Sequence, residues 1–175
     1  MAHAIKYHPG MPVLEQFVEG TLGADVALAV SAHIDLCPHC QQLSQDIAND
    51  MAAHLMQQSV KADKSEWLGM LESITAQPQL SKTQLSTQCD AAQPIIVRDR
   101  QFSVPRALQR LTAKHGKWLN LGGISTAKLP AGSDYHVSLL YISKDTQVPQ
   151  HTHLGLEMTL VLAGKIVDEN GEYHA

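Results

Sequence analysis

The chain has 175 residues, a hydrophobic fraction of 44% and a formal net charge of −4 at pH 7. This charge argues against a generic nucleic-acid binder, which would carry a basic stripe. No apolar run reaches the roughly 20 residues of a membrane span, and the first residues lack the apolar core of a signal peptide. We therefore expect a cytoplasmic protein of one or two domains that contacts neither a membrane nor nucleic acid directly.

Residues 1–75 are predicted to form a small helical domain. Their apolar residues recur at the spacing of helix faces. The three stripes are Met11, Leu14, Phe17, Val18 and Leu22; Leu43, Ile47, Met51 and Leu55; and Trp67, Leu68, Leu71 and Ile74. A domain of this size has a small core, so a bound metal ion would supply much of its folding free energy.

The most informative motif of the chain is His33-x-x-x-Cys37-x-x-Cys40. A proline follows Cys37 and suits the first position of a helix, which would place Cys37 and Cys40 on one face of that helix. His33 would reach the same point from the preceding segment. Tetrahedral zinc takes four such ligands, and His8, just before the first predicted helix, is the candidate for the fourth. The residues predict a zinc site in the helical domain.

Residues 76–94, AQPQLSKTQLSTQCDAAQP, are predicted to be a linker because they combine Gln, Ser, Thr and Pro with no sustained period. After this segment the pattern changes to short apolar stretches separated by Gly, Pro, Asp and Lys. These stretches are WLNLG, ISTAKL, HVSLLYIS and LEMTLVLAG. Such a pattern is typical of an antiparallel sandwich or barrel. We therefore expect residues 95–175 to be all-β and the whole chain to be a two-domain α+β protein.

A second constellation consists of His151, His153 and Glu157. Side chains alternate between the two faces of a strand, so these three residues would point to the same side. Two imidazoles and a carboxylate suit zinc, and equally iron or manganese with open positions. The alternative is that the three are polar residues on an exposed face. Gly164, which would turn the chain after the strand, favours the metal site.

Both constellations resemble motifs of known families. The stretch from His151 to Gly164 resembles the first conserved motif of the cupins, although Asp145 stands where a leading glycine is expected. The arrangement of His8 with the His33-x-x-x-Cys37-x-x-Cys40 motif resembles the zinc-binding anti-sigma domain. A helical zinc domain joined to a cupin barrel is the architecture of the ChrR-like anti-sigma factors. The chain resembles this family over nearly its whole length.

The resemblance implies two sets of metal ligands. His8, His33, Cys37 and Cys40 would hold a structural zinc ion. His151, His153 and Glu157 would be three ligands of a cupin metal, either zinc or another divalent transition metal. The family's fourth cupin ligand is a histidine in a second motif further along the chain than Ala175. We therefore expect the cupin domain, residues 95–175, to be incomplete at its C-terminal end.

The resemblance also implies a function. Members of the family bind an extracytoplasmic-function-type sigma factor, keep it from RNA polymerase and release it under photo-oxidative stress. We therefore expect a non-enzymatic transcriptional regulator whose zinc-dependent inhibition ends under oxidative stress of the singlet-oxygen type. The cupin would be the sensor. The apolar stripes at Leu14, Phe17 and Leu22, or at Trp67, Leu71 and Ile74, would pack either internally or against the sigma factor.

Two other functions are compatible with parts of the sequence. His151, His153 and Glu157 would also make the facial triad of a cupin metal-dependent dioxygenase, in which case the helical zinc half has no explanation. Cys37-Pro38-His39-Cys40 is also the spacing of thiol–disulfide oxidoreductases with a thioredoxin fold, and the preceding VALAV would then be a strand.

Overall fold

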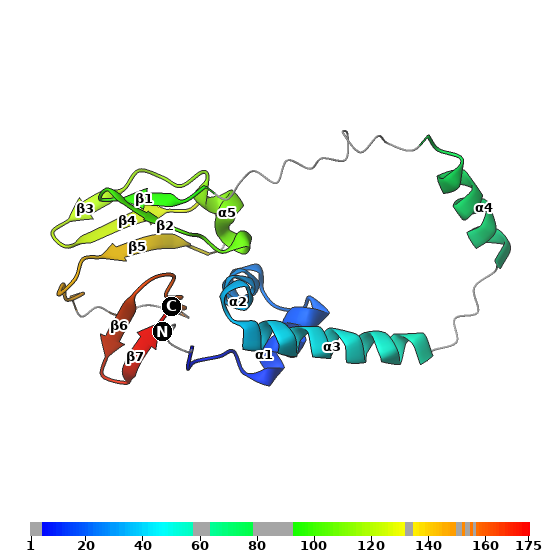
Figure 1. Ribbon diagram of the computed structural model, residues 1–175, viewed down its shortest axis with the longest axis horizontal. Helices are drawn as coiled ribbons and strands as arrows, with labels where there is room; N and C mark the ends of the chain where they lie inside the picture. Colours follow the sequence, from blue (N-terminus) through cyan, green and yellow to red (C-terminus); the bar gives the residue numbers. More distant parts are fainter. Residues whose placement is uncertain are drawn as a thin grey trace. The chain divides into compact units, whose positions relative to one another are not determined.

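The structure is a computed structural model that describes residues 5–57, 64–78, 93–131, 135–149, 152, 155 and 157–175 (Figure 1). The described helices are α1 (Met11–Glu19), α2 (Ala24–Leu36), α3 (Pro38–Gln57), α4 (Lys64–Thr75) and α5 (Arg106–Thr112). The described strands are β1 (Ile95–Val97), β2 (Arg100–Phe102), β3 (Leu119–Leu121), β4 (Ile124–Lys128), β5 (Ser138–Ile142), β6 (Lys165–Asp168) and β7 (Gly171–His174). Helices followed by antiparallel strands confirm the α+β class.

The boundaries of the first helices follow from local chemistry. Helix α1 has a proline in its first turn and ends at Gly20, whose φ of 73° is the left-handed conformation that glycine adopts without cost. Helix α2 ends at Leu36, and the extended residue Cys37 separates it from α3. Pro38, directly after this one-residue junction, cannot continue α2 because it has no backbone N–H, but it suits the first position of α3.

The strands form three small antiparallel sheets: β1–β2, β3–β4–β5 and β6–β7. In the first hairpin Val97 pairs with Arg100, and the two residues between them, Arg98 and Asp99, both have positive φ, as a type I′ turn requires. The strands of the described residues do not close into a barrel. The cupin barrel therefore stays a prediction.

Two expectations for residues 95–175 were wrong. This part is not all-β, because α5 lies between β2 and β3. Its residues Leu108 and Thr112 recur at helical spacing and are buried. The segment LEMTLVLAG was expected to be a strand, yet its described residues are outside regular structure. Leu160 and Leu162 of this segment pack against a buried cluster, so burial there comes from side-chain contacts and not from a strand ladder.

By its contacts the chain divides into two compact units. One comprises Met1–Ile47 and Ala92–Ala175, and the other comprises Ala48–Ala91. The first unit thus holds α1, α2, the start of α3, α5 and all the described strands, whereas α4 belongs to the second. The domain limits at 75 and 95 stay a prediction, and residues 79–92 of the predicted linker lie outside the described residues.

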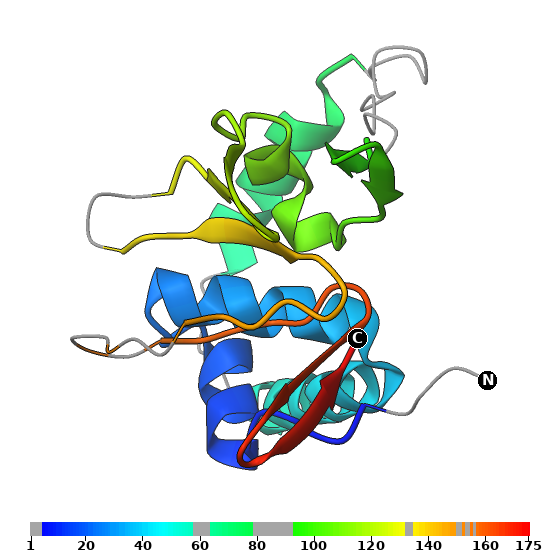
Figure 2. The ribbon, with the colours of Figure 1, turned by 90° about the vertical axis from the view of Figure 1, so that its left-hand side faces the viewer.

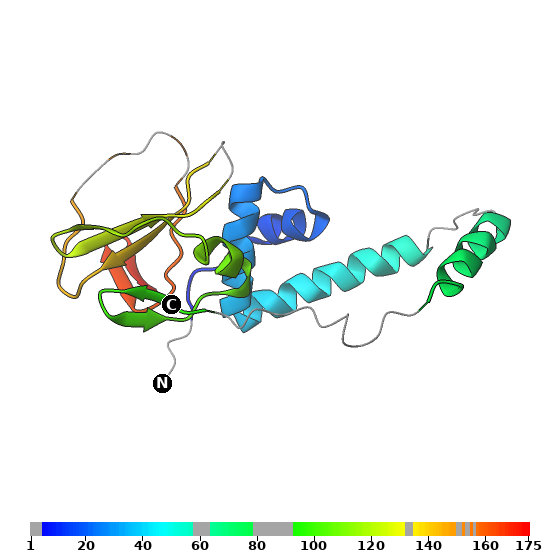
Figure 3. The ribbon, with the colours of Figure 1, turned by 90° about the horizontal axis from the view of Figure 1, so that it is seen from above.

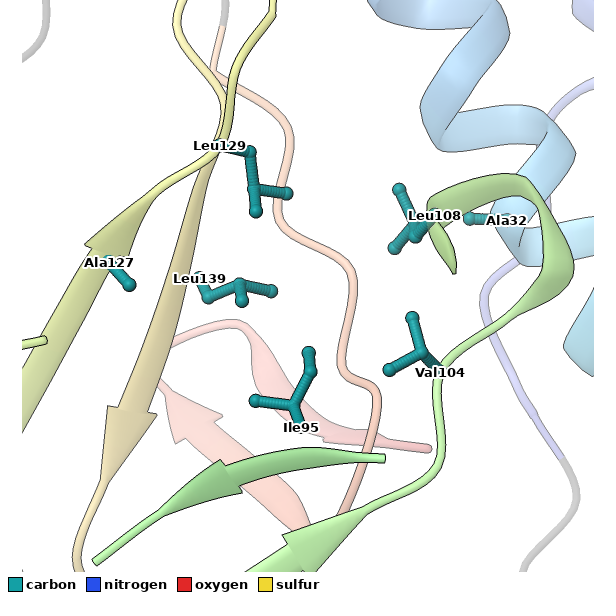
Figure 4. Close-up of a cluster of buried hydrophobic side chains, with 7 residues drawn as sticks. All are labelled: Ala32, Ile95, Val104, Leu108, Ala127, Leu129 and Leu139. Carbon is teal, nitrogen blue, oxygen red and sulfur yellow. The ribbon is translucent and has the colours of Figure 1, made fainter. Parts of the chain in front are cut away.

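The first unit has two hydrophobic clusters, which share helix α2. In one cluster Ala32 of α2, with no exposed surface, groups with side chains from the strands, from α5 and from the segments that adjoin them (Figure 4). These side chains are Ile95, Val104, Leu108, Ala127, Leu129 and Leu139. The other cluster consists of Leu14, Val30, Cys37 and Cys40. Helix α2 is therefore buried on two sides, which accounts for its apolar sequence ADVALAVSAHIDL.

Helix α5 is held against α2, as Figure 3 shows. The Asp35 carboxylate accepts a hydrogen bond of 2.9 Å from the backbone N–H of Ala107 in the first turn of α5. An acidic side chain at this place satisfies a helix N–H that has no partner within its own helix.

None of the described helices is by itself long and apolar enough to cross a membrane. Helices α1 and α2 together have the length and composition, but a bend of 107° separates them.

We expect Asp35→Ala to lower the free energy of unfolding by about 1 kcal/mol, because it removes this acceptor at the start of α5. Chemical denaturation followed by circular dichroism measures the change. Glu15→Ala, which removes an exposed carboxylate from α1, is the matched control and should leave the transition where it is. Identical transitions for the two variants would contradict the prediction.

Candidate metal centre

Four side chains predicted from the sequence to bind zinc meet at one point of the first unit. The ligand atoms of His8, His33, Cys37 and Cys40 all lie within 4.8 Å of one another. His8 comes from the segment before α1, His33 from the last turn of α2, Cys37 from the junction and Cys40 from the first turn of α3. Residues separated by up to 32 positions are thus brought together.

The junction between α2 and α3 places the two thiols. The backbone N–H of Cys37 donates to the carbonyl of His33 at 2.9 Å, so α2 is hydrogen-bonded up to the point where the chain turns. The backbone N–H of Cys40 then points at the sulfur of Cys37, 3.5 Å away, as in a helix cap. Both sulfurs lie at the N-terminal end of α3.

Two of the distances between ligand atoms match those around a tetrahedral ion. Nδ1 of His8 is 3.4 Å from the Sγ of Cys37 and 3.4 Å from the Sγ of Cys40. With Zn–S bonds of about 2.3 Å and Zn–N bonds of about 2.0 Å, ligand atoms of a tetrahedral site are separated by about 3.3–3.8 Å. The rings of His8 and His33 lie edge to face with centroids 5.7 Å apart, so both can aim at one point. The four residues could hold a metal ion.

The burial of His33 leaves one ring nitrogen free to bind an ion. His33, Cys37 and Cys40 are buried, whereas His8 is exposed. Nε2 of His33 is buried and has no hydrogen-bond partner among the described residues. A buried nitrogen without a partner costs free energy, and a metal ion bound to its lone pair would remove that cost.

The electrostatics of the cluster favour metal binding at the His33 imidazole and oppose it at the Cys40 thiol. Burial, with the charge of His8 as a second cause, lowers the pKa of His33, which keeps its imidazole neutral and able to donate a lone pair. Burial raises the pKa of the Cys40 thiol to about 11, and its hydrogen bond and proximity to Cys37 add to the effect. A metal ion must therefore displace a proton from Cys40.

His39 is a neighbour of the site that the sequence analysis did not assign. Its exposed ring lies 5.0 Å from the ring of His8, centroid to centroid. Its position in the sequence, between Cys37 and Cys40, could have indicated that it lies near the site. It is a third imidazole beside the exposed ligand.

The second predicted metal site cannot be built from the structure. His151 and His153 lie outside the described residues. Glu157 is exposed and outside regular structure. The cupin metal site stays a prediction.

The local structure around the cysteines differs from that of a thioredoxin-like oxidoreductase. Both cysteines are free thiols. The segment VALAV, residues 26–30, lies within α2 and is not a strand. The motif therefore joins two helices. In a thioredoxin-like active site the cysteines would instead follow a strand.

Alkylation of the cysteines tests this description of the site. In the metal-free chain we expect iodoacetamide to modify Cys40 faster as the pH rises toward about 11, because only the thiolate reacts. Added zinc should protect Cys37 and Cys40 while Cys89, the matched internal control, is modified at its former rate. Peptide mass spectrometry measures each site. A Cys40 rate that levels off at the ordinary thiol pKa, or equal protection of all three cysteines, would contradict the prediction.

Comparisons with known proteins identify relatives of the chain. No family model matches the sequence. The chain is 31% identical over 174 residues to the anti-sigma-E factor ChrR of Cereibacter sphaeroides, which covers 98% of this chain and 76% of the relative. Its structure matches a chain in the crystal structure of Rhodobacter sphaeroides SigE in complex with the anti-sigma ChrR. The TM-score is 0.70 at 26% identity, with 98% of this chain and 84% of that chain covered. The protein belongs to the family of ChrR-like anti-sigma factors.

Proposed function

We propose that this protein binds an extracytoplasmic-function-type sigma factor and keeps it from RNA polymerase. The observation that carries the proposal is the likeness to ChrR over 98% of the chain. A regulator of this kind needs no catalytic residue of its own. We further propose that the inhibition depends on zinc and ends under oxidative stress of the singlet-oxygen type.

Zinc is the metal that the four ligands favour. Two thiolates with two imidazoles are a donor set typical of structural zinc sites. His8 leads into α1, His33 belongs to α2 and Cys40 belongs to α3, so one ion would tie three helices together. Binding of structural zinc contributes on the order of 10 kcal/mol to folding. In our proposal, loss of the ion loosens these helices and weakens the hold on the sigma factor.

Helix α4 offers a surface for the sigma factor. Trp67, Leu71 and Ile74 are each more than half exposed, at 59%, 56% and 57%. Their spacing puts them on one face of the helix. In contrast, Leu14 of the first apolar stripe is fully buried and Phe17 packs against the cluster at the cysteines. Of the two stripes that the sequence left open, we therefore propose α4 as the one that contacts the partner.

Charge supports the same partner. The chain has a net charge of −4. A sigma factor has basic surfaces that contact nucleic acid, and an acidic inhibitor complements them. The apolar face of α4 would provide contact area, and the overall charge would favour encounter.

Release would follow from oxidation of a metal ligand. Thiolates are oxidised stepwise, and an oxidised thiolate loses its affinity for the metal. Cys37 and Cys40 are the sulfur ligands of the proposed site. We also propose, from the family resemblance, that His151, His153 and Glu157 hold zinc or another divalent transition metal in a cupin-type sensor. Either site would act by changing the geometry of the helical part.

We expect His8→Ala or Cys37→Ala to abolish sigma binding, because each removes one of four zinc ligands. The measurement is titration of the purified chain with the sigma factor that co-purifies with it, together with the zinc content per chain. Cys89→Ser is the matched control and should bind zinc and sigma factor like the parent. A Cys37 variant that holds the sigma factor as tightly as the parent would show that inhibition does not depend on zinc.

We expect Trp67→Ala to weaken sigma binding by about 30-fold or more, the range of an aromatic hot spot at an interface. The zinc content should stay that of the parent. Leu121→Ala, which truncates a leucine of β3 that is 85% exposed, is the matched control for loss of exposed apolar surface. Equal affinities of the two variants would exclude α4 as the main contact.

A further inference from the structure

His8 is the metal ligand whose position depends most on its surroundings. Residues 5–10 have no regular secondary structure, so no helix or strand of their own fixes the imidazole. His8 is also the exposed member of the four, whereas the other three are buried. Whatever holds this segment in place therefore determines whether the fourth ligand reaches the site.

The neighbour of this segment is the hairpin β6–β7. The ring of Tyr7, directly before His8, lies on the ring of Tyr173 of β7, with centroids 4.7 Å apart and planes tilted by 33°. Figure 2 shows the hairpin alongside the N-terminal segment. The approach is close at a second point, since a Cβ added at Gly171 would lie 2.9 Å from the hydroxyl of Tyr7.

The hairpin is well suited to support another segment. Its four residue pairs run from Lys165 with His174 to Asp168 with Gly171. Nζ of Lys165 is 2.9 Å from the carboxylate of Glu172, and Nε2 of His174 is 3.4 Å from the same carboxylate. The Asp168 carboxylate accepts two backbone hydrogen bonds in the turn. These interactions fix the backbone that carries Tyr173.

The hairpin also approaches the second imidazole of the site. A small cavity of about 110 Å³ is lined by Tyr7, His33, Tyr173 and His174, among other residues. The contact between the hairpin and the N-terminal segment thus lies beside both histidine ligands.

We propose that the β6–β7 hairpin positions His8 for the metal through the contact between Tyr7 and Tyr173. This inference rests on the proposed metal site. Tyr7 and Tyr173 are positioning residues: with the rings together, the segment is held where His8 reaches the two sulfurs. With the rings apart, His8 leaves more often, and a metal ion bound by the three remaining ligands is released faster. A rearrangement of β6 and β7 that moved Tyr173 would therefore change the position of His8 at the metal site.

The experiment measures zinc release from the full chain. The zinc-loaded protein is mixed with a chromophoric chelator, and the rate of transfer is followed. We expect Tyr173→Ala to release zinc about three- to tenfold faster, the factor that corresponds to the loss of an aromatic pair. Tyr173→Phe keeps the ring and should release zinc like the parent. Tyr141→Ala is the matched control, because Tyr141 pairs with Phe102 in another part of the unit.

Two further variants separate positioning from general destabilisation. Tyr7→Ala breaks the same contact without altering the hairpin and should accelerate release as Tyr173→Ala does, even if the latter disturbs the hairpin. In a His8→Ala background, Tyr173→Ala should accelerate release no further, because the ligand through which it acts is gone. Release at the parental rate from Tyr7→Ala, or additive acceleration in the double variant, would overturn the inference. A parent chain that binds no zinc would overturn the metal site together with it.

Discussion

Helix α2 is shared between the two cores of the first unit, and the rest of that unit depends on it. Ala32 and Asp35 contact the strand region and α5, whereas Val30 and His33 face the cluster that contains the cysteines. Close packing leaves little room for one helix to shift within one core alone. A movement of α2 that opened one cluster would therefore disturb the other. The helical part and the strand part are not mechanically independent, although they differ in sequence pattern.

The ligands of the candidate metal site divide into two pairs with different support. The two thiols are placed by the junction between α2 and α3, through short-range hydrogen bonds. The two imidazoles depend on the strand region, His33 through the second face of α2 and His8 through the segment at Tyr7. A movement of the strands would thus displace the two imidazole ligands before it displaced the thiols. An oxidant would act on the sulfur ligands.

Sequence reasoning succeeded where spacing along the chain determines structure. His33, Cys37 and Cys40 lie in the last turn of α2, the junction and the first turn of α3. Their convergence therefore follows from helix geometry. His8 was assigned by the need for a fourth ligand. The prediction of an all-β part was wrong in residues 95–175. Helix α5 is too short to give a clear helical period, and LEMTLVLAG has the apolar residues of a strand although its described residues form no strand. The pairing of Tyr7 with Tyr173 spans nearly the whole chain and has no local signal.

The apolar stripes of α1 and α4 have the same period but different environments. Leu14 of α1 is buried in the cluster that contains the cysteines, whereas no described residue of α4 is buried. Burial of apolar surface stabilises a small helical part only modestly, and an ion bound by three helices would add to that stability. In the proposed metal-bound state the ion would close that core without the apolar face of α4. That face would then be available to the sigma factor, and in our proposal the same small core makes inhibition depend on the metal.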